Sequence, residues 1–134
     1  MVVLDVSAAL TRVLLSQSSP AADAFFAGEL PSLAAPAVFA FELRNALLKA
    51  ERRGLTSPDL VDEAFALFAE LIELRAASGP DLVRLVGLAR REALSFFDVA
   101  YLDLALREDA AIASRDGALI EAARRRNVTI HDLR

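Results

Sequence analysis

Four acidic residues stand in or beside apolar segments, where an unpaired charge is costly. Asp5 ends the run MVVLD, Glu42 lies in AVFAFELRNALLKA, Asp98 interrupts LSFFDVAYLDLAL, and Asp116 follows AAIAS. Clustered carboxylates repel each other and raise each other's pKa unless a cation neutralises them. The chain has no Cys and a single His, so an all-oxygen ligand set would favour a hard ion, Mg²⁺ or Mn²⁺. The four residues are therefore candidate metal ligands.

Each of these residues also has an ordinary structural explanation. Asp98 and Asp116 stand where helices are predicted to begin, and Asp5 precedes another helix, so all three could be N-caps. Glu42 could form an exposed ion pair with Lys49, which would contribute little to stability. The metal interpretation depends on whether the fold brings the four carboxylates together.

The elements that must position them alternate along the chain as short apolar segments and amphipathic helices, which is typical of an α/β fold. Strands are predicted at residues 1–5, 32–36, 72–75, 110–114 and 128–133, and helices at 7–17, 19–30, 37–54, 57–71, 79–94, 98–109 and 115–127. With no internal repeat or linker, residues 1–134 form one predicted domain. The expected architecture is a short central parallel sheet flanked by helices on both faces.

In open parallel sheets, ligands bind outside the carboxyl ends of the strands. Asp5 and Asp116 are predicted to lie at that edge. Glu42 lies along the border of the apolar face of its helix, with Asn45 one turn further on that side. Asp98, taken as the first residue of its helix, faces the buried side. All four carboxylates are therefore expected to point at one edge of one sheet.

Composition excludes several classes of protein. Hydrophobic residues make up 55% of the chain, so disorder is not expected. No apolar run is long enough for a membrane helix, and the start MVVLDVS lacks the basic region of a signal peptide, so a cytoplasmic location is expected. The net charge of −4 argues against general electrostatic capture of nucleic acid. The basic residues are nearly all arginine, which is the better bidentate phosphate ligand.

Other polar residues have less specific interpretations. Asp103, five positions after Asp98, is predicted to be a surface or interface charge. Arg115, beside Asp116, is a candidate for substrate contact, with a solvated role as the alternative. The arginines of ARRRN either complement the end of a helix dipole or contact phosphate.

The order of these segments resembles the PIN-domain ribonucleases, specifically the VapC-like toxins of type II bacterial toxin–antitoxin systems. The matching segments, which span nearly the whole chain, are VVLDVSAAL, PAVFAFELRNALLKA, LSFFDVAYLDLAL and AIASRDGALIEAARRRNV. The resemblance implies an endoribonuclease that uses Mg²⁺ or Mn²⁺, forms a homodimer and is inhibited by a cognate antitoxin. The catalytic metal ligands that it implies are Asp5, Glu42, Asp98 and Asp116, and the supporting polar residues are Ser7, Asn45 and Ser114.

Two other functions remain open at this point. A haloacid-dehalogenase-type phosphatase also has an Asp after its first strand and uses Mg²⁺, but it needs a second Asp where this chain has Ser7. A catalytically silent PIN-fold module that binds a protein partner or RNA would keep the fold without turnover. Metal-dependent release of labelled RNA fragments would separate that module from a nuclease.

Overall fold

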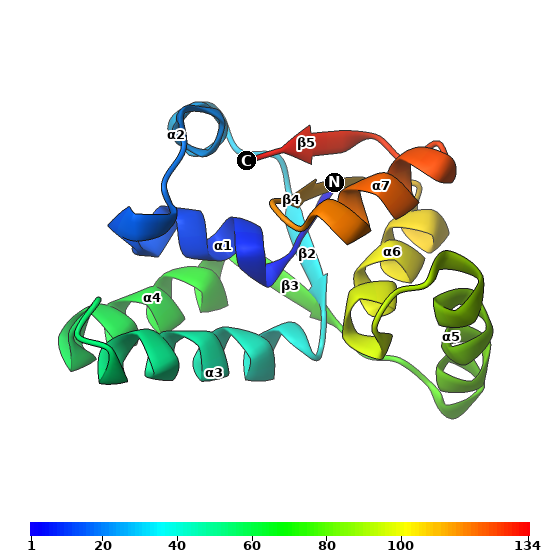
Figure 1. The fold of residues 1–134 in the computed structure, drawn as a ribbon, viewed down its shortest axis with the longest axis horizontal. Coiled ribbons are helices and arrows are strands. Elements are labelled where there is room, and N and C mark those ends of the chain that lie inside the picture. Colours follow the sequence, from blue (N-terminus) through cyan, green and yellow to red (C-terminus); the bar gives the residue numbers. More distant parts are fainter.

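The computed structural model describes residues 1–134 and contains five strands, seven α-helices and one short 3-10 helix (Figure 1). The strands are β1 (Val2–Leu4), β2 (Leu33–Pro36), β3 (Ile72–Arg75), β4 (Ala111–Ser114) and β5 (Ile130–Asp132). The helices are α1 (Val6–Val13), η1 (Leu15–Gln17), α2 (Pro20–Ala27), α3 (Phe39–Arg52), α4 (Pro58–Leu71), α5 (Gly79–Glu92), α6 (Phe96–Glu108) and α7 (Gly117–Arg125). All the predicted strands and helices are present.

The strands form one parallel sheet in the order β3-β2-β1-β4-β5. The chain steps from β1 to β2 and β3 in one direction, then returns to β4 and β5 on the other side of β1. Because crossovers between parallel strands are right-handed, α1, α3 and α4 lie on one face of the sheet, and α6 and α7 lie on the other, where α5 packs against α6 (Figure 1). This confirms the predicted α/β architecture. The strand order reverses beside β1, and ligands of such sheets bind at that switch point.

Local sequence explains where most helices begin and end. Ser19, Ser57 and Ser78 are N-caps whose side chains accept hydrogen bonds from the backbone of the first turn, each with a Pro at the first or second helical position. Gly54 follows α3 with φ of 73°, a conformation that favours glycine. None of the helices combines the length and apolar character needed to cross a membrane.

Helix α6 begins two residues earlier than predicted. Ser95 is its N-cap and accepts a hydrogen bond from the Asp98 backbone N–H at 3.0 Å. The prediction that α6 begins at Asp98 is wrong, because the serine three residues upstream caps the helix. Asp98 is therefore the third helical residue, and its carboxylate does not cap α6.

Asp103 is buried, with 3% of its surface exposed, so the prediction of a surface charge is wrong. It pairs with Arg84 of α5 and accepts a hydrogen bond from Arg107 Nε at 2.9 Å. Burial of a carboxylate is tolerated when it is paired and hydrogen-bonded in this way. Arg84 is distant from Asp103 in the sequence, so the sequence alone does not predict this pair.

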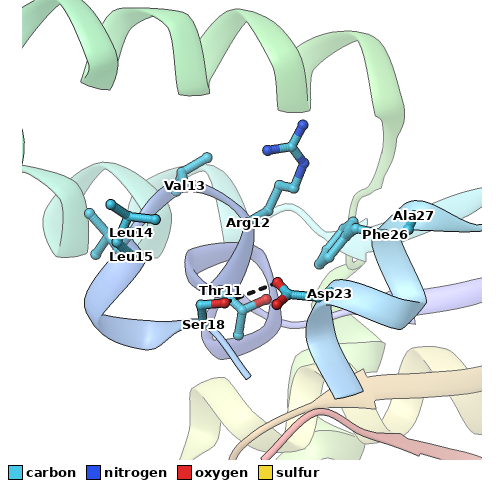
Figure 2. Close-up of a pocket in the computed structure, with 9 residues that line it drawn as sticks. All are labelled: Thr11, Arg12, Val13, Leu14, Leu15, Ser18, Asp23, Phe26 and Ala27. Carbon is cyan, nitrogen blue, oxygen red and sulfur yellow. Dashed lines mark hydrogen bonds between the residues drawn. The ribbon is translucent and has the colours of Figure 1, made fainter. Parts of the chain in front are cut away.

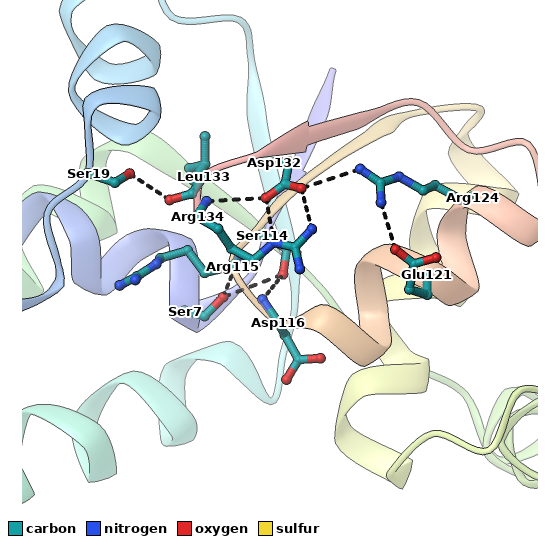
Figure 3. A network of polar contacts seen from close by, with 10 residues as sticks. All are labelled: Ser7, Ser19, Ser114, Arg115, Asp116, Glu121, Arg124, Asp132, Leu133 and Arg134. Atoms are coloured by element: carbon teal, nitrogen blue, oxygen red, sulfur yellow. Dashed lines mark hydrogen bonds and ion pairs between the residues drawn. The ribbon is translucent and has the colours of Figure 1, made fainter.

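The arginines of ARRRN are held within the chain. Arg125 and Arg126 of the α7 end bind the nearly buried Glu92 of α5, at 3.1 and 2.5 Å. Arg124 pairs with Glu121 and Asp132 (Figure 3). Together with the Asp103 pairs, these contacts tie both α6 and α7 to α5, and α6 and α7 are the helices that carry Asp98 and Asp116.

Candidate active site

The four predicted carboxylates come from elements that meet at the carboxyl-terminal edge of the sheet. Asp5 directly follows β1, Asp116 follows β4, Glu42 lies in the first turn of α3 after β2, and Asp98 lies in the first turn of α6. Electrostatic coupling links all of them. Burial is the main cause that raises the pKa of Asp5, Glu42 and Asp98, and neighbouring carboxylates of the same set raise each pKa further.

Each of the four carboxylates is electrostatically coupled to at least one other. Asp116 raises the pKa of both Asp5 and Asp98, while Asp5 and Asp98 raise the pKa of Glu42. Nevertheless, no three His, Cys, Asp or Glu side chains of the chain lie close enough together to hold one metal ion in this conformation. The fold thus places the four carboxylates around one electronegative region, but not close enough together for three of them to bind the same ion.

Asp5 is the most deeply held of the set, with 5% of its surface exposed. Its Oδ1 accepts hydrogen bonds from the Ser7 hydroxyl at 2.6 Å and the Ala8 backbone N–H at 2.8 Å. Its Oδ2 accepts one from the Ser114 hydroxyl at 2.6 Å. The carboxylate therefore caps α1 with one oxygen and keeps lone-pair capacity on the other.

The two serines also contact the loop after β4, as Figure 3 shows. Ser7 Oγ accepts a hydrogen bond from the Arg115 backbone N–H at 2.8 Å, and Ser114 Oγ accepts one from the Asp116 N–H at 2.9 Å. Each hydroxyl thus donates to Asp5 while it accepts from the segment that carries Asp116. This arrangement fits the orienting role that the resemblance implies for both serines.

Asp116 and Glu42 are each anchored through one oxygen only. Asp116 Oδ1 caps α7 by accepting the Leu119 backbone N–H at 2.8 Å. Glu42 Oε1 accepts the Tyr101 hydroxyl at 2.8 Å. In both cases the second carboxylate oxygen has no hydrogen-bond donor from the chain and is available to a cation.

The side chains of the two remaining predicted residues make no hydrogen bond to the four carboxylates. Asn45 is exposed on α3, one turn beyond Glu42. The Arg115 guanidinium donates to the backbone oxygen of Gln17 at 2.7 Å and to its side-chain oxygen at 3.1 Å. Arg115 thus holds η1 against the loop after β4, and only its backbone N–H takes part in the serine network.

A cleft of about 380 Å³ between the end of α1 and α2 lies outside this site (Figure 2). The one carboxylate that lines it, Asp23, accepts a hydrogen bond from Ser18 at 2.9 Å. None of the four coupled carboxylates lines the cleft. It offers no comparable group of ligands.

Tyr101 is a site residue that the sequence did not single out. It lies on α6 with 2% of its surface exposed, and its hydroxyl joins α6 to Glu42 of α3. Burial is the main cause that raises the pKa of Tyr101, and Glu42 raises it further, so the phenol remains a hydrogen-bond donor at neutral pH. The signal available in the sequence was its spacing, one turn after Asp98 on the same helix face.

We expect Tyr101→Phe to leave the fold intact and to weaken Mn²⁺ binding about 10- to 100-fold, the range measured when a group that orients a metal ligand is removed. The ring would still fill the core, and only the donor to Glu42 would be lost. Isothermal titration with Mn²⁺, together with a thermal melt, measures both effects. Thr11→Val, which removes a buried hydroxyl bonded to Ala8 O, is the matched control; equal Mn²⁺ affinity in both variants would contradict the expectation.

The donor set fits a hard divalent cation. The available groups are carboxylate oxygens, which Mg²⁺ and Mn²⁺ prefer. The carboxylates raise one another's pKa, so a cation among them would relieve the repulsion. Closure around an ion would require the side chains to approach one another from the positions described.

Comparison with known proteins identifies the fold. No protein-family model matches the sequence, and no curated protein matches it either. Among solved structures, PAE2754 from Pyrobaculum aerophilum aligns with a TM-score of 0.71 at 17% identity, covering 97% of this chain and 83% of its own. VapC20 from Mycobacterium tuberculosis, a toxin that cleaves the sarcin-ricin loop, aligns with 0.65 at 15% identity, covering 91% and 95%. FitAcB from Neisseria gonorrhoeae aligns with 0.65 at 17% identity, covering 97% and 96%.

These alignments extend over almost the entire chain, and identities of this size establish the fold alone. The chain has the α/β fold of the PIN domain, as the sequence predicted. What VapC20 cleaves is a property of that protein.

Proposed function

We propose that the protein is a Mg²⁺- or Mn²⁺-dependent endoribonuclease that acts in the cytoplasm as the toxin of a toxin–antitoxin pair. The observation that carries the proposal is the electrostatic coupling of Asp5, Glu42, Asp98 and Asp116 at the switch point of a PIN-domain sheet. The likeness of the fold to VapC20, a toxin that cleaves the sarcin-ricin loop, supports it.

Phosphodiester hydrolysis would need two kinds of residue at this site, metal ligands and residues that orient those ligands. Asp5, Glu42, Asp98 and Asp116 would hold the ion or ions, with Asp116 binding directly or through water. A divalent ion held by them would lower the pKa of a bound water and stabilise charge on the phosphoryl oxygens. Ser7 and Ser114 fix the orientation of Asp5, and Tyr101 fixes that of Glu42.

The test is cleavage of an end-labelled RNA pool by the purified protein in Mg²⁺, in Mn²⁺ and in EDTA. Fragments that appear only with a divalent ion are the expected result. Equal cleavage in EDTA, or none under any condition, would contradict the proposal.

A catalytically silent PIN-fold module that binds a partner is the second candidate. One observation favours it, because no three carboxylates lie within reach of a common metal ion. Isothermal titration separates the two candidates, since a silent module would bind neither Mn²⁺ nor Mg²⁺ at the carboxylate site.

The proposal includes inhibition by a cognate antitoxin. The carboxylate site is electronegative, so an arginine from the partner could enter it and replace the charge of the metal. A cognate partner that binds only at the opposite edge of the sheet, with the site left open, would defeat this part of the proposal.

We further expect a homodimer. Large apolar side chains are exposed on α3, α4 and β3, and exposed apolar side chains that gather on one face mark protein interfaces. The most exposed of them are Phe41 at 78%, Leu60 at 53% and Leu74 at 47%. Light scattering at micromolar concentration should give twice the chain mass of 14.4 kDa. A monomer mass under the same conditions would refute the expectation.

A further inference from the structure

An apolar groove borders the candidate active site. It has a volume of about 260 Å³ and lies between the end of β2, the carboxyl end of β3, helix α5 and the first turn of α6. Phe97 lines it and directly precedes Asp98, while Val38 lines it and directly precedes α3, which carries Glu42. The groove thus adjoins the elements that carry two of the four coupled carboxylates. We call it the Phe97 groove.

Two aromatic rings of the groove are open to solvent. Phe96 is 42% exposed and Phe97 is 55% exposed, although both begin a helix whose middle is buried. The aromatic pairs of the chain, such as Phe39 with Phe68, do not include either ring. Exposed aromatic faces of this kind are the surfaces on which unpaired nucleobases stack.

The groove also contains a guanidinium with unused hydrogen-bonding capacity. Arg75 lines it at the carboxyl end of β3. Its one side-chain acceptor in the chain is Glu73, at 3.3 Å, and Glu73 is itself largely exposed. The Arg75 Nε is buried without any acceptor, which is uncommon and unfavourable. The Arg75 Nη1 has no acceptor in the chain either and, unlike Nε, is not buried, so it is the donor that a phosphate could accept from.

We propose that the Phe97 groove binds one unpaired nucleotide of the RNA, with its base on Phe97 and its phosphate at Arg75. The inference rests on the proposed ribonuclease function and specifies its substrate as a single-stranded or looped segment beside the cut. Charge complementarity identifies the occupant, since an apolar protein segment would cover the phenylalanines and leave Arg75 without an anion.

The experiment uses an oligoribonucleotide that contains the fluorescent base 2-aminopurine, whose emission is quenched by stacking. Titration with the whole protein in EDTA measures binding without metal-dependent turnover, so its outcome does not depend on whether the protein cleaves RNA. We expect quenching with the single strand and none when the same base is paired in a duplex.

Two substitutions separate the stacking and phosphate contacts. Phe97→Leu keeps an apolar side chain but removes the aromatic face, and should weaken binding about 5- to 100-fold, whereas Phe97→Trp should retain it. Arg75→Gln should weaken binding and reduce the slope of log Kd against log salt by about 0.7, the value for one phosphate contact of a single strand. Arg53→Gln, an exposed arginine at the far end of α3 from Glu42, is the matched control and should leave the slope unchanged.

Quenching that is equal in the wild type and Phe97→Leu, or no quenching at all, would overturn the proposal even if the protein proves to be a nuclease. So would variants that bind RNA normally but lose affinity for an inhibitory protein, because the groove would then be a protein-docking surface. Failure of the metal-dependent cleavage test, by contrast, would refute the proposed function. The titration would still show whether the groove binds an unpaired nucleotide.

Discussion

Asp5→Asn and Asp98→Asn should each reduce metal-dependent RNA cleavage by more than about 100-fold while the fold remains intact. Removal of a group that merely orients a metal ligand already costs about 10- to 100-fold. Removal of an anionic ligand should cost at least as much. The measurements are cleavage of the labelled RNA pool and thermal melts with and without Mn²⁺.

The contacts of Asp5 explain why the fold should survive. Asn caps a helix about as well as Asp, so the amide oxygen can still accept from Ala8 N–H and Ser7. The amide nitrogen would face Ser114, whose hydroxyl can rotate to accept a hydrogen bond. Each substitution also removes one of four coupled charges, so the metal-free protein should be as stable as the wild type or more stable.

Asp23→Asn is the matched control, because Asp23 is an exposed carboxylate that accepts a hydrogen bond from Ser18 and lies outside the site. It should leave both cleavage and the Mn²⁺ shift of the melting temperature unchanged. If Asp5→Asn also keeps both, Asp5 serves as a helix cap only and the nuclease assignment fails.

Capping and metal binding are compatible uses of the same carboxylate in this fold. Asp5 and Asp116 are N-caps, as their ordinary structural explanation predicted, and each does so through Oδ1. The second oxygen of Asp116 has no donor from the chain, and that of Asp5 accepts only from Ser114. A helix that starts at the end of a parallel strand therefore fixes one oxygen and directs the other to the edge where ligands bind.

Periodicity and end signals were sufficient to predict the elements and their order. Short β-branched and alanine-rich runs gave all five strands, and Ser-Pro pairs gave the starts of α2 and α4. The start of α6 was predicted wrongly. Ser95 caps the helix, so the apolar Phe96 and Phe97 are its first two residues, which the prediction had left outside it. A cap three residues before an acidic residue was the signal that would have corrected it.

Contacts between distant segments could not be predicted from one sequence. The hydroxyl bond from Tyr101 to Glu42 joins helices separated by a β-strand and two further helices, and the pairing of Asp103 with Arg84 depends on how α5 lies against α6. Local patterns record which residues face inward. They do not record which polar groups meet in the interior, so the sequence predicted an exposed Asp103 where the structure has a buried one.

The rise in melting temperature caused by Mn²⁺ should grow as the pH increases from about 5 to 8. Asp5, Glu42 and Asp98 have pKa values raised mainly by burial, so folding favours their protonated forms. The stability linked to them is present below the pKa of the unfolded chain, about 4, and is lost as the pH rises through the raised folded-state values. Metal binding requires the ionised carboxylates, so Mn²⁺ binds more tightly over the same range.

The pH window separates these groups from Asp132 and Glu92, which are paired with arginines. Arg134 is the main cause that lowers the pKa of Asp132 to about 2, and Arg126 is the main cause that lowers the pKa of Glu92. Stability linked to lowered values is complete above the unfolded-state pKa, so neither group contributes a slope between pH 5 and 8. In that window the metal-free protein should lose stability with pH, and Asp98→Asn should flatten the slope.

At a free Mn²⁺ concentration of about 100 times Kd, binding stabilises the fold by about 2.7 kcal/mol, or on the order of 5–10 °C for a domain of this size. Melts at pH 5, 6.5 and 8, with and without Mn²⁺, measure both trends, and Asp23→Asn should follow the wild type. A Mn²⁺ shift that is equal at pH 5 and pH 8, or that Asp98→Asn retains in full, would mean that the ion binds elsewhere. The coupled carboxylates would then only destabilise the fold. A cationic group of a protein partner would be needed to neutralise their charge.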